Sequence, residues 1–205
     1  MLHYKSFRIS FKALKHDLGK GSDDMFIQTE ETPNPLTLKF LPHKPVMETG
    51  SMEFKSKEEA SIAPLAQNLL EIEGVEKVFF GETFISITKR PEIEWYVLKP
   101  CILGEIMEHF VSNRPLFKEQ PLSLQNFDDQ DALSKEIREI IDTRVRPAVA
   151  QDGGDIVFDR FEDGIVYVDM QGACSGCPSS TLTLKSGIEN MLKHYVPEVV
   201  EVRPI

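Results

Sequence analysis

The sequence predicts an α/β protein of the α+β kind, made of two small domains. Three observations lead to this prediction: the chain has 205 residues, helix-period and strand-period patterns alternate along it, and a polar segment with two prolines at 115–130 separates two such series. The second series reads α-β-β-α-β, which predicts a mixed three-stranded sheet. We therefore expect a basic segment at 1–24, a domain at 25–114, a linker at 115–130 and a domain at 131–205.

The domain at 25–114 is expected to combine a sheet with two helices. Pro64 is compatible with the first helix only if that helix starts late, and Gly74 ends it. In chain order the predicted elements are a strand at 36–40, a helix at about 58–73, strands at 75–80 and 84–88 joined by a hairpin, and a helix at 95–112.

No catalytic constellation is recognisable in this domain. Cys101 lies among apolar residues at the start of a helical stretch and has no partner nearby, so we expect a buried structural thiol. His43 and His109 are also single, and each is expected to be a surface or packed histidine and not a metal ligand.

The domain at 131–205 has sharper patterns. A helix is predicted from 131 to Pro147 or a little beyond, strands at 156–161 and 165–170, a helix from Pro178, and a closing strand at 199–202. Asp163-Gly164 is a strong hairpin signal between the two strands. The glycines of Asp152-Gly153-Gly154-Asp155 predict a tight turn with positive φ. A calcium or magnesium site is the weaker interpretation, because the two carboxylates offer too few oxygen ligands.

Composition excludes several classes of protein. Hydrophobic residues make up 41% and charged residues 27% of the chain, as in ordinary globular proteins. The net charge of −10 argues against nucleic acid as the main partner, because phosphates require a basic face, and no apolar run approaches a membrane span. Three cysteines with one close pair do not make a disulfide framework, so we expect free thiols in a reducing compartment.

The segment 1–24 differs from the rest of the chain. Its first sixteen residues contain four basic and no acidic side chains, with aromatic and aliphatic residues between them, a composition that resembles a mitochondrial presequence. Only one of the basic residues is arginine, which favours an extension from an upstream start codon. We therefore expect a bacterial cytoplasmic protein, or a mitochondrial matrix protein if the segment is a presequence.

Cys174 and Cys177 form a Cys-x-x-Cys pair between a predicted strand and a predicted helix. Two thiolates are half of the four ligands that an iron-sulfur cluster or a structural zinc ion takes. Cys101 lies in another domain, and His194 lies about 20 Å along the following helix at about 1.5 Å per residue. A second copy of the chain would supply the missing pair by two-fold symmetry.

Two other uses of the same cysteine pair remain open. A zinc-bridged dimer would need the same four thiolates. A thiol-disulfide oxidoreductase also places its motif after a strand and before a helix, although the α-β-β-α-β order is not a thioredoxin arrangement and no aromatic residue directly precedes Cys174.

The residues resemble a known family, the Nfu-type iron-sulfur cluster scaffold proteins, over nearly all of 25–202. In the C-terminal part the resemblance rests on Arg146-Pro147, Asp152-Gly153-Gly154-Asp155, residues 172–180, residues 183–192 and Pro197-Glu198-Val199. In the N-terminal part it rests on residues 25–30, Thr32-Pro33-Asn34-Pro35, Leu38-Lys39-Phe40, Gly74-Val75 and residues 78–81. Cys101 and a slight insertion at 61–66 depart from the family pattern.

The resemblance implies a carrier and not an enzyme. Cys174 and Cys177 would bind a [4Fe-4S] cluster shared between two subunits, with a [2Fe-2S] form as the alternative, and the cluster would pass from an upstream donor to apo-proteins. Gly172 and Gly176 are expected to let the loop backbone approach the cluster, and the helix after Pro178 to stabilise its negative charge. The N-terminal domain would select partners.

Overall fold

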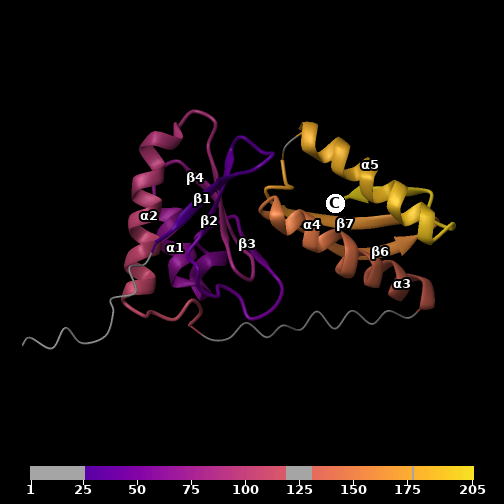
Figure 1. The fold of residues 1–205 in the computed structure, drawn as a ribbon, viewed down its shortest axis with the longest axis horizontal. Coiled ribbons are helices and arrows are strands. Elements are labelled where there is room, and N and C mark those ends of the chain that lie inside the picture. Colours follow the sequence, from indigo (N-terminus) through magenta and orange to yellow (C-terminus); the bar gives the residue numbers. More distant parts are fainter. Residues whose placement is uncertain (1–25, 119–130, 177) are drawn as a thin grey trace, which may run out of the picture.

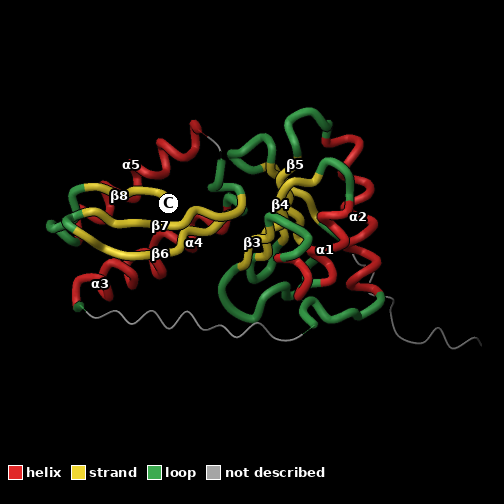
Figure 2. Tube along the Cα trace, turned by 180° about the vertical axis from the view of Figure 1, so that it is seen from behind, coloured by secondary structure: helices red, strands yellow, loops and turns green. Residues whose placement is uncertain are grey.

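A computed structural model describes residues 26–118, 131–176 and 178–205. The described chain forms two sheets with helices on each, and the two groups of elements lie side by side (Figures 1 and 2). We refer to residues 26–118 as the N-terminal half and to 131–205 as the C-terminal half. The α+β fold class is therefore confirmed, whereas the segment predicted at 1–24 lies outside the described residues.

The N-terminal half contains a five-stranded antiparallel sheet in the order β1-β2-β5-β4-β3. Its strands are β1 (Gln28–Glu31), β2 (Thr37–Leu41), β3 (Met52–Phe54), β4 (Val75–Phe80) and β5 (Ile85–Lys89). Its helices are a 3₁₀ turn, η1 (Glu59–Ile62), then α1 (Pro64–Glu71) and α2 (Trp95–Val111). The first helix starts late, at Pro64, because proline is tolerated in a first turn but not in a helix interior.

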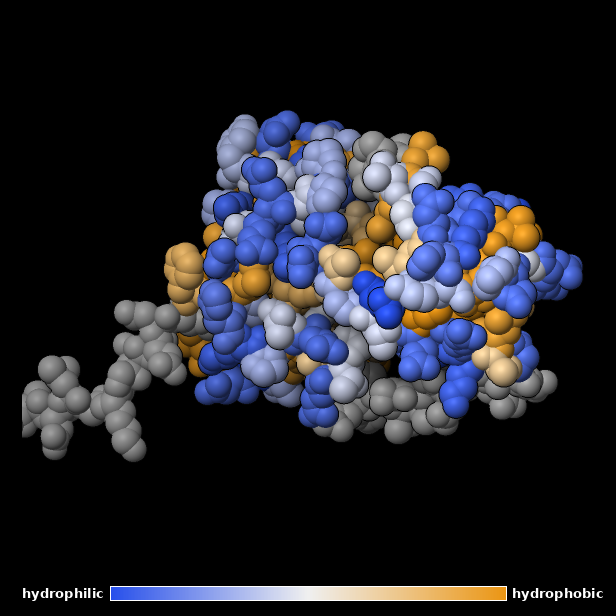
Figure 3. Space-filling view, turned by 45° about the vertical axis from the view of Figure 1, so that its right-hand side comes forward, coloured by the Kyte–Doolittle hydropathy of each residue, from blue (hydrophilic) through white to orange (hydrophobic). Residues whose placement is uncertain are grey.

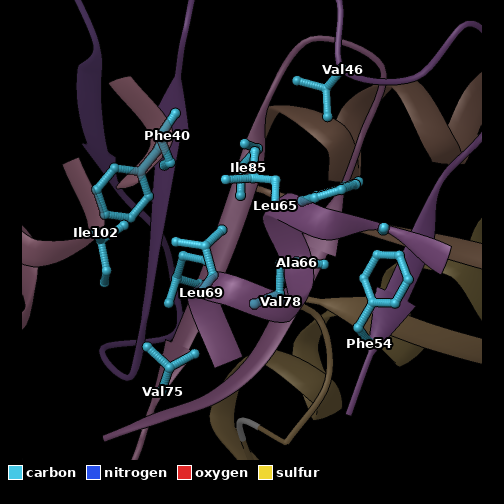
Figure 4. Close-up of a cluster of buried hydrophobic side chains, with 14 of the residues drawn as sticks. Phe40, Val46, Phe54, Leu65, Ala66, Leu69, Val75, Val78, Ile85 and Ile102 are labelled. Atoms are coloured by element: carbon cyan, nitrogen blue, oxygen red, sulfur yellow. The ribbon is translucent and has the colours of Figure 1, made fainter. Parts of the chain in front are cut away.

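Apolar side chains gather between this sheet and its two helices (Figure 4). Phe40, Val78 and Ile85 come from the strands and pack with Leu69 of α1 and Ile102 of α2, all of them fully buried. Successive side chains of a strand point to opposite faces, so the residues between them point away from the helices. No helix of the N-terminal half covers this second, outward face of the sheet (Figure 2).

Two features of the N-terminal half differ from the sequence prediction. β1 and β3 were not predicted, because one is a four-residue polar edge strand and the other has three residues, too few to establish a period. The prediction of a buried Cys101 is wrong: its side chain is exposed. Leu98 and Ile102 belong to the buried face of α2, whereas Cys101, about 100° around the helix from Ile102, lies beside that face.

The C-terminal half contains a three-stranded sheet in the order β6-β7-β8. β6 and β7 are antiparallel and β7 and β8 are parallel, which confirms the mixed sheet. In chain order the elements are α3 (Ala132–Ile140), a π turn η2 (Ile141–Val145), α4 (Arg146–Gln151), β6 (Gly154–Glu162), β7 (Ile165–Gly172), α5 (Pro178–Tyr195) and β8 (Glu201–Pro204). A separate apolar cluster joins Ile137, Ile156, Val168 and Leu192.

Two local signals act as the sequence predicts. Asp163 and Gly164 have φ of 49° and 80°, the two positive values that a type I′ hairpin turn requires. Pro147 offers no N–H for the regular bond to the preceding turn, and the helix widens into a π turn directly before Arg146 and Pro147. The predicted single helix is therefore present, but it is interrupted.

The outward face of the N-terminal sheet lies against the turns of the C-terminal half that precede β6 and follow β7 (Figure 1). Hydrophilic residues cover most of the surface in view in Figure 3, on both halves. Within the described ranges no helix has the length and apolar character to cross a membrane.

Candidate functional site

Cys174 lies in a tight turn that follows β7. Gly172 ends the strand with a φ of 60°, and the Cys174 N–H donates to the Gln171 carbonyl at 3.3 Å. The Ser175 N–H donates to the Gly172 carbonyl at 3.2 Å, and Gly176 has a φ of 80°. The left-handed values at both glycines reverse the chain over a few residues and direct it into α5. Cys177 lies outside the described residues.

The Cys174 side chain points into the C-terminal half and is 4% exposed. It lies against the backbone of Gly154, where an added Cβ would lie 2.5 Å from Cys174 Sγ and 2.7 Å from the Gln171 oxygen. Gly154 therefore makes room for the thiol. Gly153 has a φ of 82°, as the Asp-Gly-Gly-Asp pattern predicts.

Burial raises the pKa of the Cys174 thiol to about 12, and the nearby charges of Asp152 and Asp155 add to the rise. A neutral thiol is favoured because the interior solvates a thiolate poorly and the two carboxylates repel it. In this conformation Cys174 is a protonated packing residue, whereas a metal ligand is a thiolate.

Asp155 forms an ion pair with Arg146 below the turn. The Arg146 Nε and Nη2 donate to the two Asp155 carboxylate oxygens at 2.8 and 2.7 Å, and the carboxylate is 5% exposed. Asp155 and Asp142 together raise the pKa of Arg146. The engagement of Asp155 with arginine agrees with the interpretation of this motif as a structural turn and not a calcium or magnesium site.

Within residues 26–118, 131–176 and 178–205, no three His, Cys, Asp or Glu side chains form a group that could hold a metal ion. Cys101 is exposed on α2 of the other half, and His194 lies in the last turn of α5, in edge-to-face contact with Tyr195 at a ring-centroid distance of 5.0 Å. These two residues do not complete a site around Cys174. The helix α5 does begin at Pro178, directly after the cysteine pair.

Three residues of the N-terminal half reach the turn and were not found from the sequence. Glu53 Oε1 accepts from the Gly172 N–H at 3.0 Å, Lys77 Nζ donates to the Ser175 hydroxyl at 2.8 Å, and Asn34 Nδ2 donates to the Ser175 carbonyl at 3.3 Å. The available signal was weak: Lys77 and Glu53 are charged residues at outward positions of their strands, as in any half-solvated sheet.

A cleft of ≈ 310 Å³ lies between the halves beside this turn. Six of the residues that line it are Ser51, Phe79, Phe84, Arg146, Pro147 and Asp155. Ser51 of the N-terminal half donates to the Asp155 carboxylate, so the Arg146 ion pair forms one wall of the cleft.

The fold and the turn define a class of α+β protein with a cysteine pair at the end of a strand and the start of a helix, facing a second α+β unit. Family comparison agrees: residues 27–113 match "Scaffold protein Nfu/NifU N terminal", and residues 137–203 match "NifU-like domain". The chain belongs to the Nfu family of iron-sulfur cluster scaffold proteins.

Curated relatives are similar over most of the chain. The human protein named "NFU1 iron-sulfur cluster scaffold homolog, mitochondrial" is 49% identical over 88% of this chain and 72% of its own length. "NifU-like protein 4, mitochondrial" of Arabidopsis thaliana is 49% identical over 89% of this chain and 66% of its own length. A solution structure of a NifU-like protein from Saccharomyces cerevisiae is 24% identical and covers 58% of this chain and 96% of its own, with a TM-score of 0.42.

Proposed function

We propose that the chain carries a [4Fe-4S] cluster between the cysteine pairs of two copies and passes it to apo-proteins, with a [2Fe-2S] form as the alternative. Cys174 and Cys177 are the proposed ligands, and the cluster is the cargo of a carrier and not the cofactor of an enzyme. The observation that carries the proposal is the position of Cys174 in a glycine-flanked turn leading into α5, in a chain whose relatives are named as iron-sulfur cluster scaffolds.

The chemistry of the turn supports this cargo. Thiolates are the ligands that iron-sulfur clusters take, four to a cluster, and one chain offers two in this motif. The N-terminus of α5 carries a partial positive charge that favours an anionic cluster beside it. Gly172 and Gly176 lie two residues before and two residues after Cys174, and neither has a side chain that would obstruct a cluster.

We further propose that the chain has two domains with different functions, at 25–114 and 131–205, joined by a linker at 115–130. Each half has its own sheet and its own apolar cluster, which supports the division. The C-terminal domain would bind the cluster, receiving it from an upstream donor, and the N-terminal domain would select client proteins. Leu116 and Phe117, at the start of the linker, pack against the N-terminal cluster.

Anaerobic reconstitution with iron and sulfide tests the proposal. We expect a brown dimer with about four irons per two chains. Cys174→Ala should lose the cluster, whereas Cys101→Ala, which removes the exposed cysteine of α2, should bind as much iron as the wild type. A Cys174→Ala chain that retains its full cluster would exclude the assignment.

The same preparations separate the two rival uses of the cysteine pair. A zinc-bridged dimer would be colourless and would contain zinc. A thiol-disulfide oxidoreductase would reduce insulin at a substantial rate, but reactive thiols have lowered pKa values, and the pKa of Cys174 is raised.

We propose the mitochondrial matrix as the location. The bacterial cytoplasm, which the sequence favoured, gains no support from the human and Arabidopsis relatives, because both carry "mitochondrial" in their names. The basic, acid-free composition of residues 1–16 suits a presequence.

A further inference from the structure

Four cross-strand neighbours form a row on the outward face of the N-terminal sheet. The strand register pairs Lys39 with Ser86, Ser86 with Phe79, and Phe79 with Glu53. No helix of the N-terminal half covers this face, yet Ser86 and Phe79 are each 1% exposed and the Glu53 side chain is 4% exposed. The C-terminal half accounts for this burial, because it contacts every member of the row.

Hydrogen bonds follow the row across the sheet. The first two join the sheet to the segment that precedes β6, and the third joins the sheet to the last residue of β7. They run from Lys39 Nζ to the Gln151 carbonyl at 3.0 Å, from Ser86 Oγ to the Gly153 carbonyl at 2.7 Å, and from the Gly172 N–H to Glu53 Oε1 at 3.0 Å.

The N-terminal half also binds the other side of Cys174. Lys77 Nζ donates to the Ser175 hydroxyl at 2.8 Å, and Asn34 Nδ2 donates to the Ser175 carbonyl at 3.3 Å. Gly172 and Ser175 lie on either side of Cys174, so the sheet holds the turn from both ends.

The two surfaces leave no space at their closest points. A Cβ added to Gly153 would lie 2.9 Å from Ser86 Oγ, and one added to Gly172 would lie 3.0 Å from a ring carbon of Phe79. A cluster and a second chain could not approach the turn through this contact.

We propose that the outward face of the N-terminal sheet is the docking surface for the Cys174 turn of its own chain, and that it must release the turn before two copies share a cluster. This inference rests on the proposed function. Sharing requires Cys174 Sγ to face a second chain, whereas here the side chain points into the C-terminal half and its flanking residues are tied to the sheet.

The contact is suited to release. Its hydrogen bonds come from lysine, serine, asparagine and glutamate side chains, which water can satisfy after separation. Phe79 is the large apolar member of the row, so little apolar surface becomes exposed. Contacts of this polar kind between domains resemble transient protein interfaces.

Alkylation of the cluster-free chain with iodoacetamide tests the proposal, with exposed Cys101 as the reference thiol in the same sample. Glu53→Ala/Lys77→Ala removes one hydrogen bond on each side of Cys174. Relative to Cys101, Cys174 should react about tenfold faster in this variant than in the wild type, because hydrogen bonds to charged groups hold the turn. Tandem mass spectrometry distinguishes the labelled cysteines.

The control is Lys57→Ala/Glu58→Ala, which makes the same charge changes at two exposed residues away from the turn. It should leave the ratio of rates at the wild-type value. An unchanged ratio in folded Glu53→Ala/Lys77→Ala, checked by circular dichroism, would overturn the proposal. Because these rates need no cluster, failure of the proposal is distinguishable from failure to bind iron and sulfide.

Hydrogen exchange of the wild-type chain gives a second test that needs no variant. The Gly172 amide should be protected in the cluster-free chain and should lose protection after anaerobic loading with iron and sulfide, while Val168 in the middle of β7 stays protected. Equal protection of Gly172 in the loaded and cluster-free chains would also overturn the proposal.

Discussion

Replacing Arg146 by methionine would leave the buried carboxylate of Asp155 without its ionic partner. That carboxylate is 5% exposed and receives two hydrogen bonds from Arg146, at 2.8 and 2.7 Å. Removing one member of a buried pair costs about 3–5 kcal/mol. Arg146 is itself 30% exposed and Ser51 still donates to Asp155, so we expect a loss of about 2–3 kcal/mol from the free energy of unfolding.

Urea unfolding followed by far-UV circular dichroism measures this loss. With a slope of about 1–2 kcal/mol per M urea, the midpoint should fall by about 1–3 M. Trp95, the single tryptophan, lies in the N-terminal half, so its fluorescence transition should move less than the transition seen by circular dichroism.

The same arginine supplies the control. Its Nη1 also pairs with Asp142 at 3.2 Å, but that carboxylate is 44% exposed. Asp142→Asn should therefore change the free energy of unfolding by about 0.5 kcal/mol or less. Equal midpoint shifts for Arg146→Met and Asp142→Asn would show that burial does not strengthen the ion pair between Arg146 and Asp155.

Three further outcomes are expected. Gly164 has a φ of 80°, and an added Cβ would lie 2.9 Å from Val200 Cγ2, so Gly164→Ala should lower the free energy of unfolding by about 1–3 kcal/mol. Gly187 lies in α5, where an added Cβ would meet nothing, so Gly187→Ala should raise the free energy of unfolding by about 0.5–1 kcal/mol. Shifts of the two urea midpoints in the same direction would contradict this. The free energy of unfolding should fall as pH rises from 9 toward 12, because the pKa of the Cys174 thiol is near 9.0 in the unfolded chain and about 12 in the folded chain. Between about pH 8 and 10.5 the urea midpoint of Cys174→Ser should therefore fall less than that of the wild type. An equal fall would contradict the effect of burial on this thiol. Sequencing the N-terminus of the natural protein should find residues 1 to about 24 removed if they are a presequence, and an intact Met1 would contradict the mitochondrial proposal.

Local signals in this sequence were strong enough to predict most of the C-terminal half. Asp163-Gly164 predicts its turn because few residue pairs accept two positive φ values in succession. The alternation of apolar and polar residues predicts strand β7, and the three- and four-residue spacing of apolar residues predicts helix α5. The order of these elements along the chain then predicts the mixed sheet. Such features depend on neighbours in the chain, so the sequence alone carries them.

Features that depend on distant residues were missed. Cys101 was expected to be buried because apolar residues flank it, but the rotation of α2 on its core decides exposure. The contacts of Ser86 with Gly153 and of Glu53 with Gly172 involve outward strand positions, where a polar residue that faces water cannot be distinguished from one that binds another part of the chain.

Native mass spectrometry of the anaerobically reconstituted chain tests whether two copies share one cluster, because it weighs protein and cluster together. We expect a species of two chains with one [4Fe-4S] cluster, which disappears in Cys174→Ser and persists in Cys101→Ser. A single chain that holds a complete cluster, or a Cys174→Ser dimer that still holds one, would contradict the claim that two copies share the cluster through this cysteine.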